Sequence, residues 1–123
     1  MNDNPIVRMF EWWNTAITRP DGFTPEAFGN HFSADARLIV NGDLRGQGLD
    51  ALARHFRNIQ AEYDSVAMEL PPLDTFACDG RAFVQVVTRA VRDGKVLREE
   101  SMAVATLDGD RMSLLKVIGR SLD

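Results

Sequence analysis

Apolar residues recur with a helical period in two stretches of the chain. The first stretch gives a predicted helix one apolar face, made of Ile6, Met9, Phe10, Trp13 and Ile17. Asn4 and Pro5 precede this face, and these residue types suit the N-cap and the first helical position. The second stretch carries its apolar face at Leu49, Leu52, Ala53, Phe56, Ile59 and Tyr63. Both spacings predict amphipathic helices, and the second helix is expected to fade near Tyr63.

Between these stretches the sequence predicts a short helix and a short strand. Thr24 is a good N-cap for a helix that ends near Phe32. Residues 37–40 are branched and apolar, which suits a strand. The Asn-Gly-Asp sequence at 41–43 favours a tight turn, because these residues accept left-handed backbone. Residues 46–48, Gly-Gln-Gly, then bracket a short extended piece that leads into the second amphipathic helix.

Extended segments replace helices in the second half of the chain. Residues 66–70 alternate, and Pro71-Pro72 then removes two donors from the ladder, which indicates an edge strand or a bulge. The same strand is expected to resume at 74–78. Longer extended runs follow at 81–91, 95–107 and 111–119, separated by turns that contain Asp-Gly. Such hairpins predict an antiparallel meander, and helices followed by this sheet predict an α+β domain.

Composition narrows the class of protein. A chain of 123 residues is long enough for one domain, residues 1–123, with a sizeable core. The net charge of −4, without a block of lysines or arginines, disfavours nucleic acid as a partner. No apolar run approaches the ~20 residues that a membrane span needs, and the first ten residues lack the features of a signal peptide. The lone Cys78 excludes an intrachain disulfide, which favours a cytoplasmic location.

The order of elements and three sequence pieces resemble the NTF2-like superfamily. The pieces are FSADARLIVNG, LRGQGLDALARHF and DGDRMSLLKVIGR, and they look like its SnoaL-like branch. The resemblance implies a cone in which three N-terminal helices pack in a strongly curved, mostly antiparallel sheet, with a pocket at the wide end. Members include ketosteroid isomerases, polyketide cyclases, epoxide hydrolases, dehydratases and non-catalytic binding proteins. Such a fold does not by itself settle function.

The resemblance also allows a comparison with the ketosteroid isomerases. Those enzymes use a base aspartate after the first strand, a protonated acid on the penultimate strand and a tyrosine from the first helix. The matching positions in this sequence are Val40, Ala103 and either Trp12 or Trp13. A shift of one or two residues would offer Asn41 or Ser101, neither of which is an adequate general base. Steroid isomerisation of that kind is therefore disfavoured.

Two ionisable residues remain candidates for acid–base chemistry. Counting from Gly94 places the odd-numbered residues of the penultimate strand inside, so Glu99 would enter an apolar cavity and suit general acid–base work. The opposite register would leave it in water. His55, at the edge of the second apolar stripe, could act as a base, a hydrogen-bond donor or only a polar rim. His31 is expected to be structural. The resemblance and the same count suggest pocket walls at Trp12, Trp13, Val40, Val84, Thr88 and Ser101.

The outer face of the predicted sheet is unusually apolar. Its expected members are Phe83, Gln85, Val87, Met102 and Val104. A homodimer joined through this face would cover these groups. The two histidines lie far apart, and the sequence has no H-x-x-x-H motif, Cys pair or phosphate-binding glycine loop, so we expect neither a metal nor a cofactor.

Two functions from different classes follow. In the first, the chain is an enzyme that acts on a small hydrophobic metabolite by cofactor-independent acid–base chemistry of isomerase, cyclase, hydrolase or dehydratase type. In the second, it is a non-catalytic ligand-binding or dimerisation module. The vacant isomerase positions favour the second function, and an inward Glu99 would favour the first. Whether Glu99 and His55 open onto a common cavity separates the two in part.

Overall fold

The computed structural model describes residues 4–123, and this range contains three helices and six strands. In chain order the elements are α1 (Pro5–Ala16), α2 (Pro25–Phe28), β1 (Phe32–Val40), β2 (Asp43–Gln47), α3 (Leu49–Glu62), β3 (Ser65–Cys78), β4 (Arg81–Arg92), β5 (Lys95–Asp108) and β6 (Arg111–Ser121). Only α1 and α2 precede the sheet, because β1 and β2 come before α3. The expectation of three N-terminal helices is therefore too simple.

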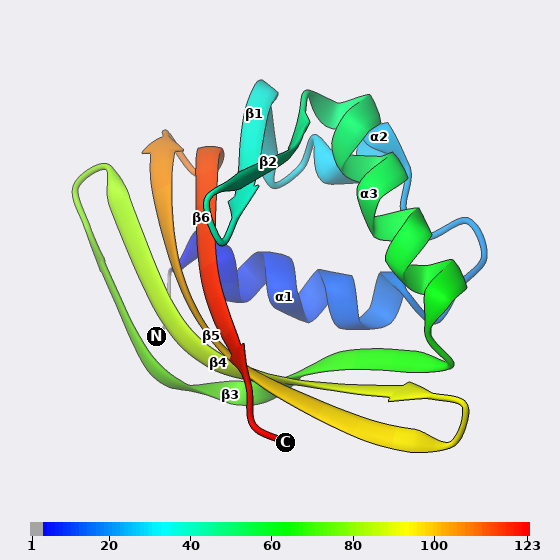
Figure 1. The fold of residues 1–123 in the computed structure, drawn as a ribbon. Coiled ribbons are helices and arrows are strands. Elements are labelled where there is room, and N and C mark those ends of the chain that lie inside the picture. Colours follow the sequence, from blue (N-terminus) through cyan, green and yellow to red (C-terminus); the bar gives the residue numbers. More distant parts are fainter. Residues whose placement is uncertain (1–3) are drawn as a thin grey trace.

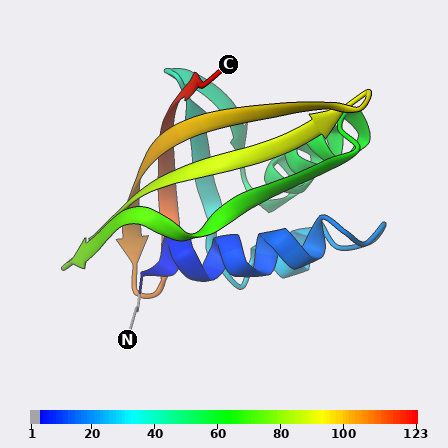
Figure 2. The ribbon, with the colours of Figure 1, turned by 90° about the horizontal axis from the view of Figure 1, so that it is seen from below.

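One curved sheet contains all six strands in the order β2-β1-β6-β5-β4-β3. β1 and β6 run parallel and the other four neighbouring pairs are antiparallel, so the sheet is mixed. Figure 1 shows the long strands β3, β4 and β5 bending around the space that α1 occupies. Figure 2, turned by 90°, shows α1 lying along the concave side of these strands. The predicted Asp-Gly hairpins are confirmed, with positive φ at Gly80, Gly94 and Gly109.

The boundary between α2 and β1 differs from the prediction. The helix ends at Phe28 instead of near Phe32, and Phe32 is the first residue of the strand. Phe32 pairs with Met112 of β6, and the Met112 amide donates to the His31 carbonyl at 2.9 Å. A partner from the far end of the sequence thus recruits this segment into the sheet. Local helical spacing of Phe28 and Phe32 contains no information about that partner.

The prolines of β3 lie where the sequence places them. β3 is an edge strand of the sheet, which is the position that tolerates missing donors. Its pairing with β4 is regular up to Glu69 and resumes at Asp74, so Pro71 and Pro72 lie in an irregular stretch. The prediction of an interrupted edge strand is confirmed. The interruption lies where β3 bends around α1 (Figure 1).

An aromatic cluster fills the space between α1, α2 and α3. Trp13 packs against Phe23 and Phe56 with ring centroids 5.4 and 5.9 Å apart, and Phe28 stacks on Phe56 at 5.4 Å. These residues are at most 9 % exposed. The predicted apolar faces of both amphipathic helices supply Trp13 and Phe56, which explains why the two helices meet there. Aromatic pairs in such offset and edge-on arrangements add to the burial of their large apolar surface.

Asn4 caps α1 and also ties the helix to the sheet. Its Oδ1 accepts from the amides of Ile6 at 2.9 Å and Val7 at 3.4 Å, which confirms the predicted cap. Its Nδ2 donates to the carbonyls of Phe76 at 3.2 Å and Phe83 at 3.0 Å. Asn4 is only 2 % exposed; its two capping bonds are buried and its two bonds to the sheet are partly buried. One side chain therefore satisfies the helix start and anchors it to the β3–β4 hairpin.

Replacing Asn4 by Ala should lower the free energy of unfolding by about 1–3 kcal/mol, because the cap is lost and buried groups lose partners. Replacing it by Ser keeps a capping oxygen but removes the donor to the β3–β4 hairpin, so this variant should fall between Ala and the wild type. Urea denaturation measures both variants. Asn58→Ala, at an exposed site on α3, serves as the matched control and should change stability by less than about 0.5 kcal/mol. Equal stabilities for Asn4→Ser and wild type would contradict a tethering role.

Candidate functional site

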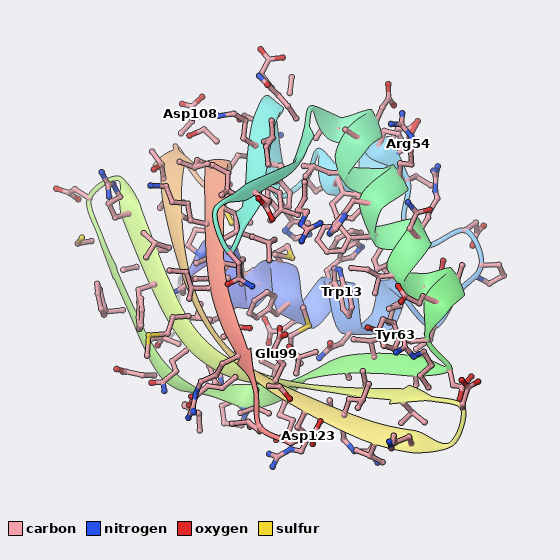
Figure 3. The ribbon with its side chains drawn as sticks, in the orientation of Figure 1. Trp13, Arg54, Tyr63, Glu99, Asp108 and Asp123 are labelled. Atoms are coloured by element: carbon pink, nitrogen blue, oxygen red, sulfur yellow. The ribbon has the colours of Figure 1, made fainter. Side chains whose placement is uncertain are left out.

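A cavity of about 410 Å³ lies between α1, α3 and the concave face of the sheet. Its inner wall is apolar and includes Met9, Phe10, Trp13, Leu38, Phe56, Val86, Ala103 and Leu115. Its polar lining residues are Asn41, Arg45, His55, Tyr63, Thr88, Glu99 and Ser101. Figure 3 shows Trp13, Tyr63 and Glu99 within the space enclosed by the helices and the sheet, whereas Arg54 extends from α3 to the outside. Apolar walls with a few polar groups are the usual composition of a ligand site.

Glu99 comes from β5 and lines this cavity, as the odd-numbered register implies. Ser101, Ala103 and Ala105 of the same register are buried, so the predicted inward face of β5 is confirmed. Glu99 itself is exposed and lies where the cavity opens, so water reaches its carboxylate. The Ser101 hydroxyl donates to Glu99 Oε1 at 3.4 Å. The enclosed apolar surroundings expected for Glu99 are therefore found deeper along the strand, around Ser101 and Ala103.

Gly119 makes room for the Glu99 carboxylate. Gly119 of β6 pairs with Ser101 of the neighbouring strand β5, and a Cβ atom at Gly119 would lie 2.9 Å from Glu99 Oε1 and 3.0 Å from Ser101 Oγ. The Gly119 amide also donates to Asn41 Oδ1 at 3.0 Å. Because glycine has no side chain, the Glu99 carboxylate can lie against the backbone of β6 at Gly119. Sequence reasoning missed this role, because the contact depends on the β5–β6 register.

His55 reaches the cavity from α3. It is half-buried, and its ring meets the edge of Phe56 at a centroid distance of 4.9 Å. Burial lowers the pKa of the His55 imidazole below its usual range, and the positive charge of Arg45 lowers the pKa further. The imidazole is therefore neutral near pH 7, where one ring nitrogen carries a proton and the other accepts. A neutral histidine can give or take a hydrogen bond in the same place.

The structure brings together most of the residues expected at a pocket, but not all. The residues that line the common cavity are Trp13, Val40, His55, Thr88, Glu99 and Ser101. Trp12 lies outside it and packs on Phe28 and His31, because neighbouring residues on a helix point in different directions. Val84 also lies outside it, since its side chain is fully buried in the core. Trp12 and Val84 are therefore structural residues in this arrangement.

The lining residues that were not predicted as pocket walls or acid–base groups include Asn41, Arg45, Tyr63 and Ile59. Ile59 and Tyr63 belong to the predicted apolar stripe of α3, so their spacing carried a signal that they face inward. Asn41 and Arg45 lie on the β1–β2 hairpin, whose position beside the cavity depends on how β1 pairs with β6. Nothing local in the sequence indicates that this hairpin faces α3.

A second space of about 340 Å³ adjoins the cavity at the end of α3. The two spaces share Ile59, Tyr63, Val66, Thr88 and Glu99, so Glu99 stands between them. The outer space is bordered by Glu62, Arg98 and Asp123, so more of its lining side chains are charged than in the inner cavity. The inner cavity thus has a vestibule with charged side chains beside it.

Two further properties of residues 4–123 bear on the type of site. None of the helices in this range has the length and apolar character needed to cross a membrane. The same range contains no group of three or more His, Cys, Asp and Glu side chains arranged to hold a metal ion. Cys78 is free and exposed, away from the cavity.

Comparison with known proteins establishes the class of fold. No protein-family model and no curated protein matches the sequence. Among solved structures, an NTF2-like protein of unknown function from Exiguobacterium superposes with a TM-score of 0.78 at 16 % identity, over 94 % of this chain and 98 % of that chain. IdmH, a proposed polyketide cyclase from Streptomyces antibioticus, gives 0.73 at 12 % identity over 94 % and 88 % of the two chains.

A third similar structure is a protein with a ketosteroid isomerase-like fold from Catenulispora acidiphila, solved in complex with trimethylamine. It gives a TM-score of 0.69 at 15 % identity, over 85 % of this chain and 79 % of that chain. The chain thus has the NTF2-like fold, which confirms the resemblance found in the sequence. At such low identities the likeness extends to the fold and leaves activity open.

Replacing His55 by Gln should make stability less dependent on pH. The pKa of His55 is lowered in the folded state, so the unfolded chain takes up more protons than the folded chain as pH falls from about 7.5 to about 5.5. The free energy of unfolding therefore falls over this interval. The melting temperature of the wild type should therefore drop more over this interval than that of the variant. His31 contributes separately, because burial and the charge of Arg8 lower its pKa. The double variant, with both His31 and His55 replaced by Gln, should therefore show the smallest drop in melting temperature. Identical drops for wild type and His55→Gln would contradict the prediction.

Proposed function

We propose that the protein binds a small hydrophobic metabolite in this cavity and acts on it by cofactor-independent acid–base chemistry. The observation that supports the proposal most directly is that Glu99 and His55 line one common cavity. The reaction belongs to the isomerase, cyclase, hydrolase or dehydratase type, since each of these needs only a proton acceptor, a proton donor and an enclosed site. The likeness to a proposed polyketide cyclase agrees with this class by analogy of fold.

Glu99 and His55 are assigned complementary roles in this proposal. The Glu99 carboxylate accepts a proton from the bound molecule; the Ser101 hydroxyl donates to this carboxylate, and Gly119 leaves room for it. His55 is neutral, so its N–H donates a hydrogen bond to an oxygen on which charge develops. Trp13, Val40 and Thr88 shape the walls that orient the molecule. The isomerase positions at Val40 and Ala103 carry no acid, which excludes them as the proton-transfer groups.

The second candidate function is a non-catalytic ligand-binding module. The feature that favours it is the exposure of Glu99 to water, because acid–base residues are commonly tuned by removal from solvent. In that case Glu99 and His55 serve only as polar contacts for the ligand. The two functions share the cavity and differ in whether the bound molecule is converted.

Replacing Glu99 by Gln should abolish turnover while leaving ligand binding nearly intact, because Gln keeps the shape but cannot accept the proton. A thermal-shift screen against metabolite libraries identifies ligands by the rise in melting temperature that binding produces. Each ligand is then incubated with wild type and variant, and products are followed by mass spectrometry. Ser113→Ala, outside the cavity, is the control. A substrate converted normally by Glu99→Gln would refute the mechanism, and ligands that no form converts would favour the binding module.

We further propose that two copies associate through the outer face of the sheet. Phe76 stacks on Phe83 at 5.0 Å, and Phe83 pairs with Val104 of β5. Met102 and Ile118 continue the apolar surface on the next strands and are 49 % and 70 % exposed. These five residues form the outer patch. Val87, expected on this face, is already buried within the chain, and Gln85 donates to Glu100 at 3.0 Å, so both contribute less than expected.

Replacing Met102 by Glu should convert a dimer to a monomer, because it places a charge in the centre of the outer patch. Two such patches can bury more than ~1,000 Å² in total, which suits a stable dimer. Light scattering at micromolar concentration gives the mass of wild type and variant. Val96→Glu, an exposed apolar residue near the β4–β5 hairpin turn, is the matched control and should remain dimeric. A monomeric wild type would contradict this association.

A single domain and a cytoplasmic location stay part of the proposal. One continuous hydrophobic core joins α1, α2, α3 and the concave face of the sheet, which supports one domain. The exposed free thiol of Cys78 is compatible with a reducing compartment.

A further inference from the structure

The charged side chains that line the cavity come from different elements. Among the described lining residues, Arg45 from β2 carries a positive charge and Glu99 from β5 a negative one. His55 is neutral and lies near Arg45. Thr88 pairs with Glu99 in the sheet, and the Ser101 hydroxyl donates to the Glu99 carboxylate. The lining therefore has a donor side on the β1–β2 hairpin and α3 and an acceptor side on β4 and β5, and the two sides meet at Gly119, which both Asn41 and Glu99 approach. A bound molecule meets both.

The guanidinium of Arg45 is held only weakly by its ion pair with Asp43. This ion pair joins Arg45 Nη2 to Asp43 Oδ2 at 4.0 Å, the limit of such a contact, and the two side chains are 46 % and 75 % exposed. Exposed pairs of this kind contribute little, so the guanidinium gives up little by turning to a ligand. Its planar fork of N–H groups matches the two oxygens of a carboxylate. The lining thus contains a cation that is available to an anionic oxygen.

Asn41, on the same hairpin as Arg45, adds a second donor to the lining of the cavity. Its Oδ1 accepts from the Gly119 amide at 3.0 Å, which leaves the Nδ2 group as the free end of a side chain that lines the cavity. Nδ2 has two hydrogens and no acceptor capacity. Together, Arg45, Asn41 and the N–H of a neutral His55 present donors and no ionised acceptor. This combination recognises an oxygen that carries negative charge.

We infer that the ligand is a hydrophobic ring compound with an anionic oxygen group, a carboxylate or an ionised hydroxyl, held by Arg45, Asn41 and His55. The inference rests on the proposed function, because it names the class of molecule that the same cavity binds. The anionic group lies on the hairpin side, the ring lies on the apolar wall around Trp13, and the remaining edge faces Glu99. Proton removal at that edge adds negative charge to the ligand, and Arg45 is placed to stabilise it.

The opposite possibility is a cationic ligand, because the carboxylate of Glu99 also lines the cavity. A cationic ligand would pair with Glu99 and be repelled by Arg45, and the carboxylate would then be occupied and unable to take a proton. The net charge of −4 attracts cations to the whole surface, so anion selectivity at the cavity would have to come from local donors. Selectivity between charges therefore tests the inference directly.

Calorimetric titration with three probes of similar size provides the test: naphthoate, acetylnaphthalene and naphthylmethylamine, which are anionic, neutral and cationic near pH 7. We expect naphthoate to bind wild type roughly three- to tenfold more tightly than acetylnaphthalene, and naphthylmethylamine to bind most weakly. Arg45→Gln should remove the preference for naphthoate while leaving acetylnaphthalene unchanged. Arg54→Gln removes the same charge from the outer side of α3 and should leave every affinity unchanged (Figure 3).

Each other outcome is decisive. Equal binding of naphthoate and acetylnaphthalene, or a preference for naphthoate that survives in Arg45→Gln, would overturn the inference while the cavity stays a ligand site. Tightest binding of naphthylmethylamine, lost in Glu99→Gln, would replace the anion with a cation as the ligand class. Failure of all three probes to bind would refute the proposed function itself, and the inference with it.

Discussion

The attachment of α1 across the concave side of the sheet is the constraint on which the rest of the structure depends. Asn14 Nδ2 donates to the Met68 carbonyl and Asn14 Oδ1 accepts from the Met68 amide, both at 2.9 Å. One amide side chain thereby satisfies both polar groups of a residue on an edge strand, which would otherwise need water or another strand. With Asn4 at the other end, α1 is held at two points to the bending strands. The distance between helix and sheet sets the depth of the cavity.

The same attachment decides which aromatic residue reaches the cavity. With one side of α1 turned to the sheet, Trp13 points between α3 and the cavity and Trp12 points to His31 and Phe28. The Trp13 Nε1–H is buried without a hydrogen-bond partner among residues 4–123, which is a costly state for a donor. The Trp13 and Phe56 rings pack edge-on at a centroid distance of 5.9 Å. The wall of the cavity is thus packed with aromatic rings, while the Trp13 Nε1–H forms no hydrogen bond with residues 4–123.

The polar side of the cavity depends on backbone pairing rather than on a motif. The β5–β6 register sets Gly119 beside Ser101 and leaves space for Glu99, and the parallel β1–β6 pairing brings Asn41 to the Gly119 amide. Arg45 follows on the same hairpin and stands near His55 of α3. Charges that are separated along the chain thus meet around one apolar space.

The sequence by itself determined the elements whose signals are local. The cap at Asn4, the apolar stripes of α1 and α3, the Asp-Gly hairpins and the interrupted edge strand all rest on residues within a few positions of one another. The inward register of β5 came from the count that the family resemblance supplied, which left the opposite register open, and the burial of Ser101 and Ala103 confirms it. His55 could be placed at the edge of a helical stripe from the spacing of the apolar residues around it.

Only the tertiary structure decided how these elements meet. The early start of β1 at Phe32 comes from pairing with Met112, and the choice of Trp13 over Trp12 comes from the attachment of α1 to β3. Asn41, Arg45 and Gly119 joined the site through strand pairings that span most of the chain. Such pairings depend on the total packing of the sheet against the helices. A residue's immediate neighbours in sequence carry almost no information about them, which is why the donor side of the cavity could not be predicted.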